Sequence, residues 1–297
     1  MPRDRGGHQH GAGEHIPLPI GATSYVFRYL LSDPSTAPSL PNLLRLARAA
    51  GLDRLQVCEN ARPLDAGPSA WTGLHHAAAG LGLEISLGCM TLSPDIFRQY
   101  LDCTEALGGS DLRLVLESPA EAPLSSDRIR AFLDQVVPSL ESRRIRLAIE
   151  NHFAIPSRTL AEAAASYSPE SVGFCLDVAN SLRNFEDWEK VFDLLGDRAV
   201  CYHLKDYRID GSNVGFSVSG APFGEGHIDA FAILRRIFAK TAAPTIYLET
   251  WTPSTGDRQT DIAVDAQWLA TSIANLRNLL SAIAPPQTES PPGSPIP

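Results

Sequence analysis

The stretch IRLAIENH, residues 145–152, decides how the fold is interpreted, because an apolar run ends directly in Glu150, Asn151 and His152. A short, nearly continuous apolar run is typical of a buried strand. In a barrel of parallel strands the carboxyl ends of the strands face the active site. If this stretch is such a strand, Glu150 and His152 point into a functional site.

Seven similar apolar runs alternate with segments of helical periodicity, as in successive βα units. The eight strand candidates are residues 22–27, 52–58, 83–89, 111–117, 145–150, 172–177, 199–205 and 245–249. They begin about every 30 residues, which is close to the repeat of a (β/α)8 TIM barrel. A doubly wound open sheet is the alternative, but the turn RYLLSDPST at 28–36 has no phosphate-binding glycine. We therefore expect an α/β protein with a (β/α)8 TIM barrel.

The length and composition indicate one large folded domain. The chain has 297 residues, of which 44% are hydrophobic and 20% charged, which is enough for one sizeable core. Residues 1–16 are rich in Gly and His, and residues 285–297 are rich in Pro, so both are predicted to be disordered tails. Residues 17–284 are the expected barrel domain.

Charge and cysteine content exclude several classes of partner. A net charge of -9 argues against nucleic-acid binding, which requires clustered Lys and Arg. No run approaches the roughly 20 apolar residues of a membrane span, and the start of the chain has no apolar export signal. The five cysteines include no C-x-x-C pair, which fits a reducing compartment. We expect a cytoplasmic protein, and a homo-oligomer remains open.

Four consecutive strand candidates place a metal-ligand side chain at or near their carboxyl ends. These residues are Glu150, Asp177, His203 and Glu249. Each acid alone is compatible with a helix cap or a salt bridge, and the histidine with a core position, but four in succession at one rim favour a common site. Crowded carboxylates repel one another unless a cation neutralises them. The set predicts one divalent metal ion, with Mn, Mg, Co or Fe favoured and Zn also compatible.

Several motifs together resemble the xylose isomerase-like sugar phosphate isomerases and epimerases, a TIM-barrel family that includes endonuclease IV. The motifs are IENH (149–152), LDVAN (176–180), HLKD (203–206), FGEGHID (223–229) and YLET (247–250). The resemblance covers nearly the whole predicted domain. It implies a single metal ion, Mn first and Mg or Co next, on the same four residues that the strand ends indicate.

Two branches of this family fit less well. The trinuclear zinc site of the endonuclease needs more histidines than this domain has, and it would place one where Asn180 stands. The ketohexose 3-epimerases also carry histidine there, and they carry an arginine at the position of Ile209, although Arg208 is adjacent. The substrate is therefore not defined by the resemblance.

The resemblance implies a metal-dependent isomerase or epimerase that removes a proton next to the carbonyl of a sugar or keto-sugar and forms an enediolate. Glu150 and Glu249 are candidates to exchange the proton. His152 is the alternative base, or it orients Glu150. Lys205 either stabilises the enediolate or forms a salt bridge to Asp206 or a neighbouring carboxylate. The alternatives are a lyase or dehydratase acting on 3-oxo-glycosides or cyclitols, and a sugar-binding barrel without catalysis.

Further residues near the strand ends are candidate contacts to a small carbohydrate substrate. Gln56 and Asn60 have side chains suited to hydrogen-bond hydroxyl groups, whereas Arg113 either binds an anion or pairs with Glu117. The other candidates are Asn180, Arg208 and Trp251, the last of which stacks on a sugar or packs in the core. The long connection at 207–226 is a candidate lid over the site.

Overall fold

The protein is a closed barrel of eight parallel strands, in the order β1-β10-β7-β6-β5-β4-β3-β2, which confirms the predicted TIM barrel. The computed structural model describes residues 18–116 and 124–283, so both predicted tails and Glu117 lie outside the described residues. The barrel strands are β1 (Gly21–Thr23), β2 (Arg54–Val57), β3 (Glu84–Met90), β4 (Asp111–Val115), β5 (Arg146–Glu150), β6 (Val172–Asp177), β7 (Ala199–Leu204) and β10 (Ile246–Leu248).

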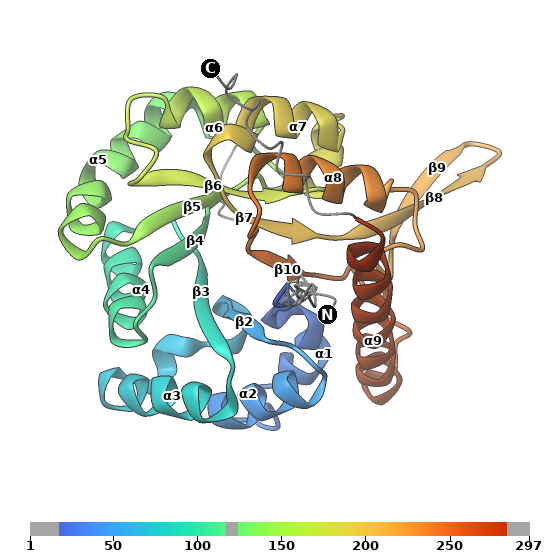
Figure 1. Cartoon of the computed structure of the whole chain (residues 1–297), viewed down its shortest axis with the longest axis horizontal. Helices are drawn as coiled ribbons and strands as arrows, with labels where there is room; N and C mark the ends of the chain where they lie inside the picture. The colour runs from blue at the N-terminus through green and yellow to red at the C-terminus, as the bar shows by residue number, and fades with distance from the viewer. Residues whose placement is uncertain (1–17, 117–123, 284–297) are drawn as a thin grey trace, which may run out of the picture.

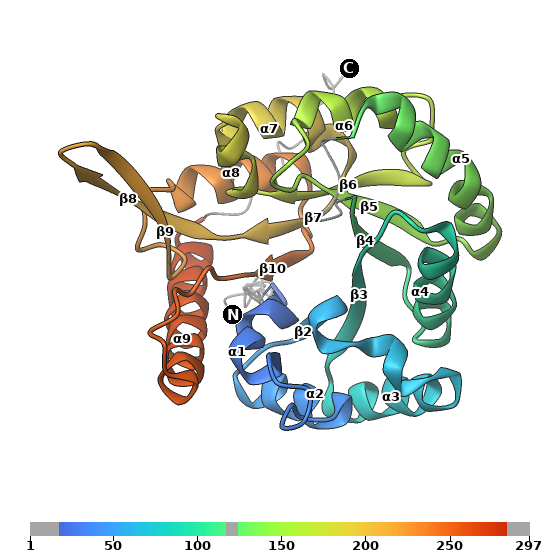
Figure 2. The same ribbon diagram turned by 180° about the vertical axis from the view of Figure 1, so that it is seen from behind.

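Helices surround the ring of strands on the outside (Figures 1 and 2). The α-helices are α1 (Arg28–Leu31), α2 (Leu40–Ala49), α3 (Pro68–Leu81), α4 (Pro94–Ala106), α5 (Ser126–Arg143), α6 (Ser157–Ala164), α7 (Trp188–Leu195), α8 (Ala230–Lys240) and α9 (Arg258–Ala282). Short 3-10 helices are η1 (Ser24–Phe27), η2 (Glu59–Ala61), η3 (Pro63–Ala66), η4 (Asn180–Asn184) and η5 (Gly196–Arg198). Because helices cover the outside and side chains fill the interior, strands such as β6 are buried along their whole length.

Local sequence signals set where several helices begin. Asp187, Asp229 and Asp257 precede α7, α8 and α9, and each carboxylate accepts a hydrogen bond from a backbone N–H in the first turn. Such caps satisfy N–H groups that have no partner within the helix. No helix in the described ranges is long and apolar enough to cross a membrane. All five cysteines are buried and free.

The first strand is shorter than expected. The sequence predicts a strand over residues 22–27, but β1 ends at Thr23 and residues 24–27 form the 3-10 helix η1. The Ser24 hydroxyl donates to Asn60 Oδ1 and accepts from the Cys58 N–H at 2.9 Å. These bonds turn the chain across the mouth of the barrel after β1.

The connection at 207–226 is also more regular than a loop. It contains an antiparallel hairpin of β8 (Asp206–Ser212) and β9 (Gly215–Ala221), which extends away from the ring of helices (Figures 1 and 2). Its base lies directly on the segment after β10, because a Cβ added to Gly220 would lie 2.2 Å from the Trp251 carbonyl oxygen. The hairpin is thus fixed at its base and exposed towards its tip.

Candidate functional site

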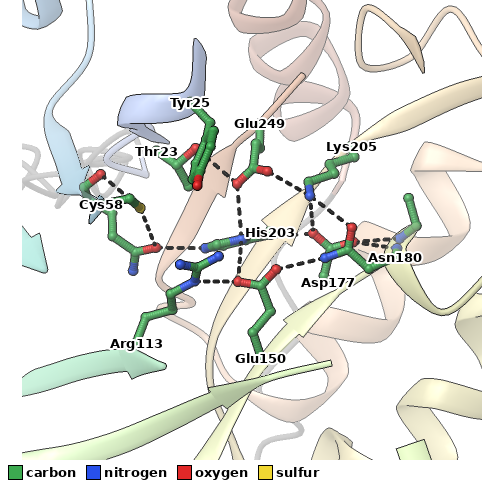
Figure 3. Close-up of polar contacts among 12 residues, drawn as sticks. Thr23, Tyr25, Cys58, Arg113, Glu150, Asp177, Asn180, His203, Lys205 and Glu249 are labelled. Atoms are coloured by element: carbon green, nitrogen blue, oxygen red, sulfur yellow. Dashed lines mark hydrogen bonds and ion pairs between the residues drawn. The ribbon is translucent and has the colours of Figure 1, made fainter. Parts of the chain in front are cut away.

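The four predicted metal ligands meet at the carboxyl ends of the barrel strands, around the imidazole of His203 (Figure 3). His203 Nδ1 lies 3.5 Å from Glu150 Oε2, 3.9 Å from Asp177 Oδ2 and 3.4 Å from Glu249 Oε2. All four residues are buried, and Glu249 is the most exposed of them. We call Glu150, Asp177, His203 and Glu249 the carboxylate cluster.

The two ring nitrogens of His203 have different surroundings. Nε2 lies 2.9 Å from Gln56 Oε1, whereas Nδ1 has no hydrogen-bond partner among the described residues. Burial lowers the pKa of His203 and so favours the neutral ring, in which Nε2–H donates to Gln56 and the Nδ1 lone pair faces the three carboxylates. A lone pair facing carboxylates is stable only where a cation lies among them. The residues therefore fit a divalent metal ion, and Gln56 would orient its histidine ligand.

A second set of donor atoms overlaps this cluster. Atoms of Glu150, Cys175 and His203 that can bind a metal lie within 4.8 Å of one another. Burial raises the pKa of the Cys175 thiol well above its ordinary value, and only a thiolate is an effective metal ligand. The oxygen-rich set with Asp177 and Glu249 is the better match to a hard divalent cation.

Two buried cations flank the carboxylate cluster on either side. The Arg113 Nε–H donates to Glu150 Oε2, and Lys205 Nζ lies 3.0 Å from Asp177 Oδ2 and 2.7 Å from Glu249 Oε1. Burial by itself raises the pKa of Glu150, but Arg113 and the other nearby cationic groups hold it well below its usual range. Burial likewise lowers the pKa of Lys205, but Asp177 and Glu249 keep it above its ordinary value. Both cations remain charged, and each is paired with carboxylates of the cluster.

Asn180 links the two halves of the cluster. Its Nδ2 donates to Glu150 Oε1 at 2.7 Å, and its Oδ1 accepts from Lys205 Nζ at 3.0 Å. Its backbone N–H donates to Asp177 Oδ1 at 2.8 Å. This predicted substrate residue thus lies inside the site and fixes the positions of Lys205 and the acids.

The structure places the other predicted residues at different distances from the cluster. Trp251 is half-buried, with its ring centroid 5.2 Å from Lys205 Nζ. Asn60 contacts Ser24, so it supports the turn after β1. Arg208 is exposed on β8 and lies near Glu225, so it is not brought to the cluster. His152 is partly buried beyond the end of β5, with its ring 4.3 Å from that of Phe153.

Asp206 has a different partner from the one considered for Lys205. Its carboxylate accepts hydrogen bonds from the backbone N–H groups of Tyr207, Gly224, Gly226 and Ile228. Gly226 is required here because a Cβ at this position would lie 2.0 Å from Asp206 Oδ1. The pairing of Lys205 with Asp206 is therefore wrong, because Asp206 holds the FGEGHID segment while Lys205 faces the site.

Sequence reasoning missed two residues that contact the site, Thr23 and Glu59. The Thr23 hydroxyl donates to Glu249 Oε2 at 3.0 Å, and its place at the end of β1 is the same signal that identified the other strand-end residues. Glu59 lies 3.3 Å from Arg113 Nη1 and accepts a hydrogen bond from the Tyr25 hydroxyl at 2.6 Å. Glu59 lies in the 3-10 helix η2 after β2, so strand alternation gives no signal for it.

Comparisons with known proteins identify the family of the chain and its fold. The sequence profile of the xylose isomerase-like TIM barrel family matches residues 44–272. The 3-oxo-isoapionate decarboxylase of Pectobacterium atrosepticum is 26% identical over 259 residues, which are 86% of this chain and 94% of the decarboxylase.

Solved structures share the architecture at low sequence identity. A xylose isomerase domain protein from Planctomyces limnophilus has a TM-score of 0.67 and 14% identity, over 81% of this chain and 93% of that protein. A xylose isomerase-like TIM barrel protein from Mycobacterium smegmatis, in complex with magnesium, has a TM-score of 0.59 and 15% identity, over 86% of this chain and 98% of that protein. At these identities the likeness shows the shared fold.

Proposed function

Because the chain belongs to the xylose isomerase-like TIM barrel family, we propose that it is a divalent-metal-dependent enzyme acting on a keto-sugar or a related polyhydroxylated keto compound. The observation that carries this proposal is His203 Nδ1, a buried nitrogen that has no hydrogen-bond partner in the described part of the chain and faces three carboxylate oxygens at 3.4–3.9 Å. Glu150, Asp177, His203 and Glu249 would hold the ion. Mn is the first choice for an oxygen-rich set, with Mg, Co, Fe and Zn as alternatives.

The residues around the cluster fit a reaction that places negative charge on the substrate. When bound, the metal ion would supply a Lewis acid for the oxygens of an enediolate. Lys205 and Arg113 are buried cations beside the same position, where charge–charge interactions are stronger than in water. Asn180 and Trp251 hold the Lys205 ammonium from two sides and so fix its direction. All these features stabilise an anion next to a carbonyl.

Cleavage of a bond next to the carbonyl is the reaction that the site favours. The two carboxylate oxygens of Glu150 already accept hydrogen bonds from Asn180 and Arg113. Those of Glu249 are bonded to Lys205 and Thr23. Such carboxylates are better suited to hold a metal ion than to receive a proton. Loss of CO2 from a 2-hydroxy-3-oxo acid leaves the electron pair of the broken C–C bond in an enediolate, which then takes up a proton from solvent. The cleavage step therefore needs a site for the enediolate and no base. The 26% identical relative is named as a decarboxylase.

An isomerase or epimerase, which is the first prediction from the sequence, is the second candidate. Glu150 and Glu249 approach the imidazole of His203 from two sides (Figure 3), and in this reaction they would exchange the proton despite their existing hydrogen bonds and ion pairs. His152 lies two residues beyond Glu150 and is the alternative base.

Proton NMR in D2O distinguishes these reactions. The metal-loaded protein is incubated with ketoses, 3-oxo sugar acids, 3-oxo-glycosides and inosose-like cyclitols, and deuterium incorporation, CO2 release and elimination products are followed. A lyase gives cleavage products with deuterium at the carbon that lost the group. An epimerase gives label without cleavage. Tight sugar binding with neither outcome over long incubation would instead support a non-catalytic barrel. Glu249→Gln is the matched variant, and we expect it to lose most metal-dependent turnover.

A further inference from the structure

A second feature of the barrel mouth is a large apolar cavity beside the carboxylate cluster. Its volume is about 1120 Å³. The hairpin and the segments that follow β1, β5, β6 and β10 contribute its walls, which include Phe153, Leu182, Phe185, Ile209, Phe216, Val218 and Trp251. We call this cavity the apolar annex.

The apolar annex is adjacent to the proposed active site. Asn180 and Trp251 line the annex and also contact Lys205, which in turn lies 2.7 Å from Glu249 Oε1. Within the carboxylate cluster, the Glu249 side chain is 9% exposed, whereas those of Glu150, Asp177 and His203 are fully buried. Glu249 is therefore the member of the cluster that solvent reaches.

The outer wall of the annex is apolar although it faces water. Ile209 on β8 pairs with Val218 on β9, and Phe216 lies on the same face as Val218 because it is two residues away. Phe185 in the loop after η4 is 89% exposed, and Phe216 is 68% exposed. Contiguous apolar surface of this kind marks a binding site more often than isolated exposed side chains do.

The walls of the annex are held together before any ligand binds. Gly220 allows the base of β9 to lie against the Trp251 backbone, where any side chain at this position would collide with it. The Trp251 ring also packs near Phe153, with the centroids 5.8 Å apart. A preformed wall avoids the entropic cost of ordering a flexible one on binding.

A free sugar does not account for this cavity. Ligand pockets of about 300–1,000 Å³ hold molecules of drug size, and the annex is at least as large even without the carboxylate cluster. Sugar hydroxyls require polar partners, whereas most of the annex walls are aliphatic or aromatic. Flat aromatic groups fit such walls by stacking and edge contacts.

We propose that the apolar annex binds an aromatic group joined to the keto-sugar, so that the substrate is an aryl conjugate and not a free sugar. This proposal rests on the proposed function for the end of the substrate that reaches the carboxylate cluster. The sugar carbonyl lies at Lys205 and Glu249, Trp251 lies at the junction, and the aromatic group lies between the hairpin and Phe185.

Calorimetric titration of the metal-loaded full chain with 2-naphthyl β-D-glucoside and with methyl β-D-glucoside tests this proposal. We expect the naphthyl compound to bind about 10- to 100-fold more tightly, because its ring buries apolar surface in the annex. Val218→Ser and Phe216→Ser should remove most of this difference. Val214→Ser is the matched control, because Val214 lies on the same hairpin, is 97% exposed and does not line the annex. It should leave the ratio of the two affinities unchanged.

Other outcomes separate this proposal from the proposed function. Equal affinities for the two glucosides, together with metal-dependent turnover of a free keto-sugar, would overturn the aryl conjugate and leave the enzyme proposal intact. A naphthyl preference that Val218→Ser abolishes, in a protein that neither binds metal nor turns over, would support the annex and contradict the enzyme. Analytical ultracentrifugation tests whether a second copy of the chain covers the annex instead. A dimer that Phe216→Ser dissociates, together with no naphthyl preference, would make the annex an interface between copies and overturn the aryl conjugate.

Discussion

The two sides of the barrel mouth differ in opposite ways from the usual pattern of buried apolar and exposed charged residues. The carboxylate cluster with Arg113 and Lys205 buries ionised groups that soluble proteins normally expose, whereas the apolar annex exposes Phe185 and Phe216. Neither arrangement favours folding, because buried charged groups lose their hydration and exposed aromatic side chains contribute no hydrophobic stabilisation. Their common position at the carboxyl ends of the strands indicates that both serve a ligand, the first its charge and the second its apolar part.

The largest effect is expected from removing the centre of the cluster. His203→Ala should lower bound metal from about one ion per chain to near zero and reduce turnover by about 10³-fold or more, because the metal contributes several kcal/mol to transition-state stabilisation. Elemental analysis and the NMR assay measure both. His75→Ala, on the exposed face of α3, is the control and should change neither. Full activity in metal-free protein would contradict the assignment of the cluster.

Lys205 tests whether the buried charge acts on the substrate. Lys205→Met should reduce kcat by about 10²- to 10³-fold while metal content stays near one ion per chain, because the ammonium stabilises the enediolate without holding the ion. Lys240→Met removes an exposed lysine that pairs with Asp197, and it should leave kcat unchanged. Loss of metal together with activity in Lys205→Met would assign Lys205 to the support of Asp177 and Glu249.

The role of His152 distinguishes proton transfer from positioning. If His152 removes a proton, His152→Gln should retain the metal, lower kcat by about 10²-fold and abolish the acidic limb of the kcat/KM profile. If it orients Glu150, metal affinity should fall instead, and added metal should restore the rate. A decarboxylation that needs no base would leave kcat nearly unchanged in this variant, and so would favour the lyase over the epimerase.

Substitution of Gln56 tests whether its contact with Nε2 of His203 orients this proposed metal ligand. Gln56→Leu should weaken metal affinity by about 10- to 100-fold, because His203 Nε2–H loses its acceptor and the ring its fixed orientation. Metal in excess should then recover the rate. Gln135→Leu on α5, where the side chain only donates to Ala131 O, is the control. An unchanged metal dissociation constant for Gln56→Leu would show that Gln56 does not orient the ligand.

The smallest effect is expected in the annex. Phe185→Ser should change the free energy of unfolding by no more than about 0.5 kcal/mol, because a side chain that is 89% exposed contributes little to the core. Denaturant titration measures this change. Phe97→Ser, at a fully buried position of α4, should by contrast destabilise the fold by several kcal/mol. A large loss in Phe185→Ser would mean that the annex is part of the folding core and not a ligand surface.

The strands and the candidate metal ligands were accessible from the sequence because both depend on local patterns. Apolar runs that end in Glu150 and Asp177 mark buried strands and their functional ends, and β5 and β6 end at these residues. These sequence patterns predict the wrong secondary structure where tertiary contacts favour another conformation. Ser24–Phe27 has the composition of a strand but turns into η1, because the Ser24 hydroxyl is bonded to residues after β2.

By itself the sequence determined the repeat, the order of the strands and the residue types at their carboxyl ends, since alternation and spacing are properties of the chain. Only the tertiary structure decided which atoms meet: that His203 Nδ1 faces three acids, that Lys205 joins Asp177 and Glu249, and that Asp206 does not pair with Lys205. It also decided that the hairpin faces the loops after β5 and β6 across an apolar cavity. The physical reason is that such contacts join residues far apart in the chain, whose distances depend on closure of the barrel, whereas burial and periodicity depend on near neighbours.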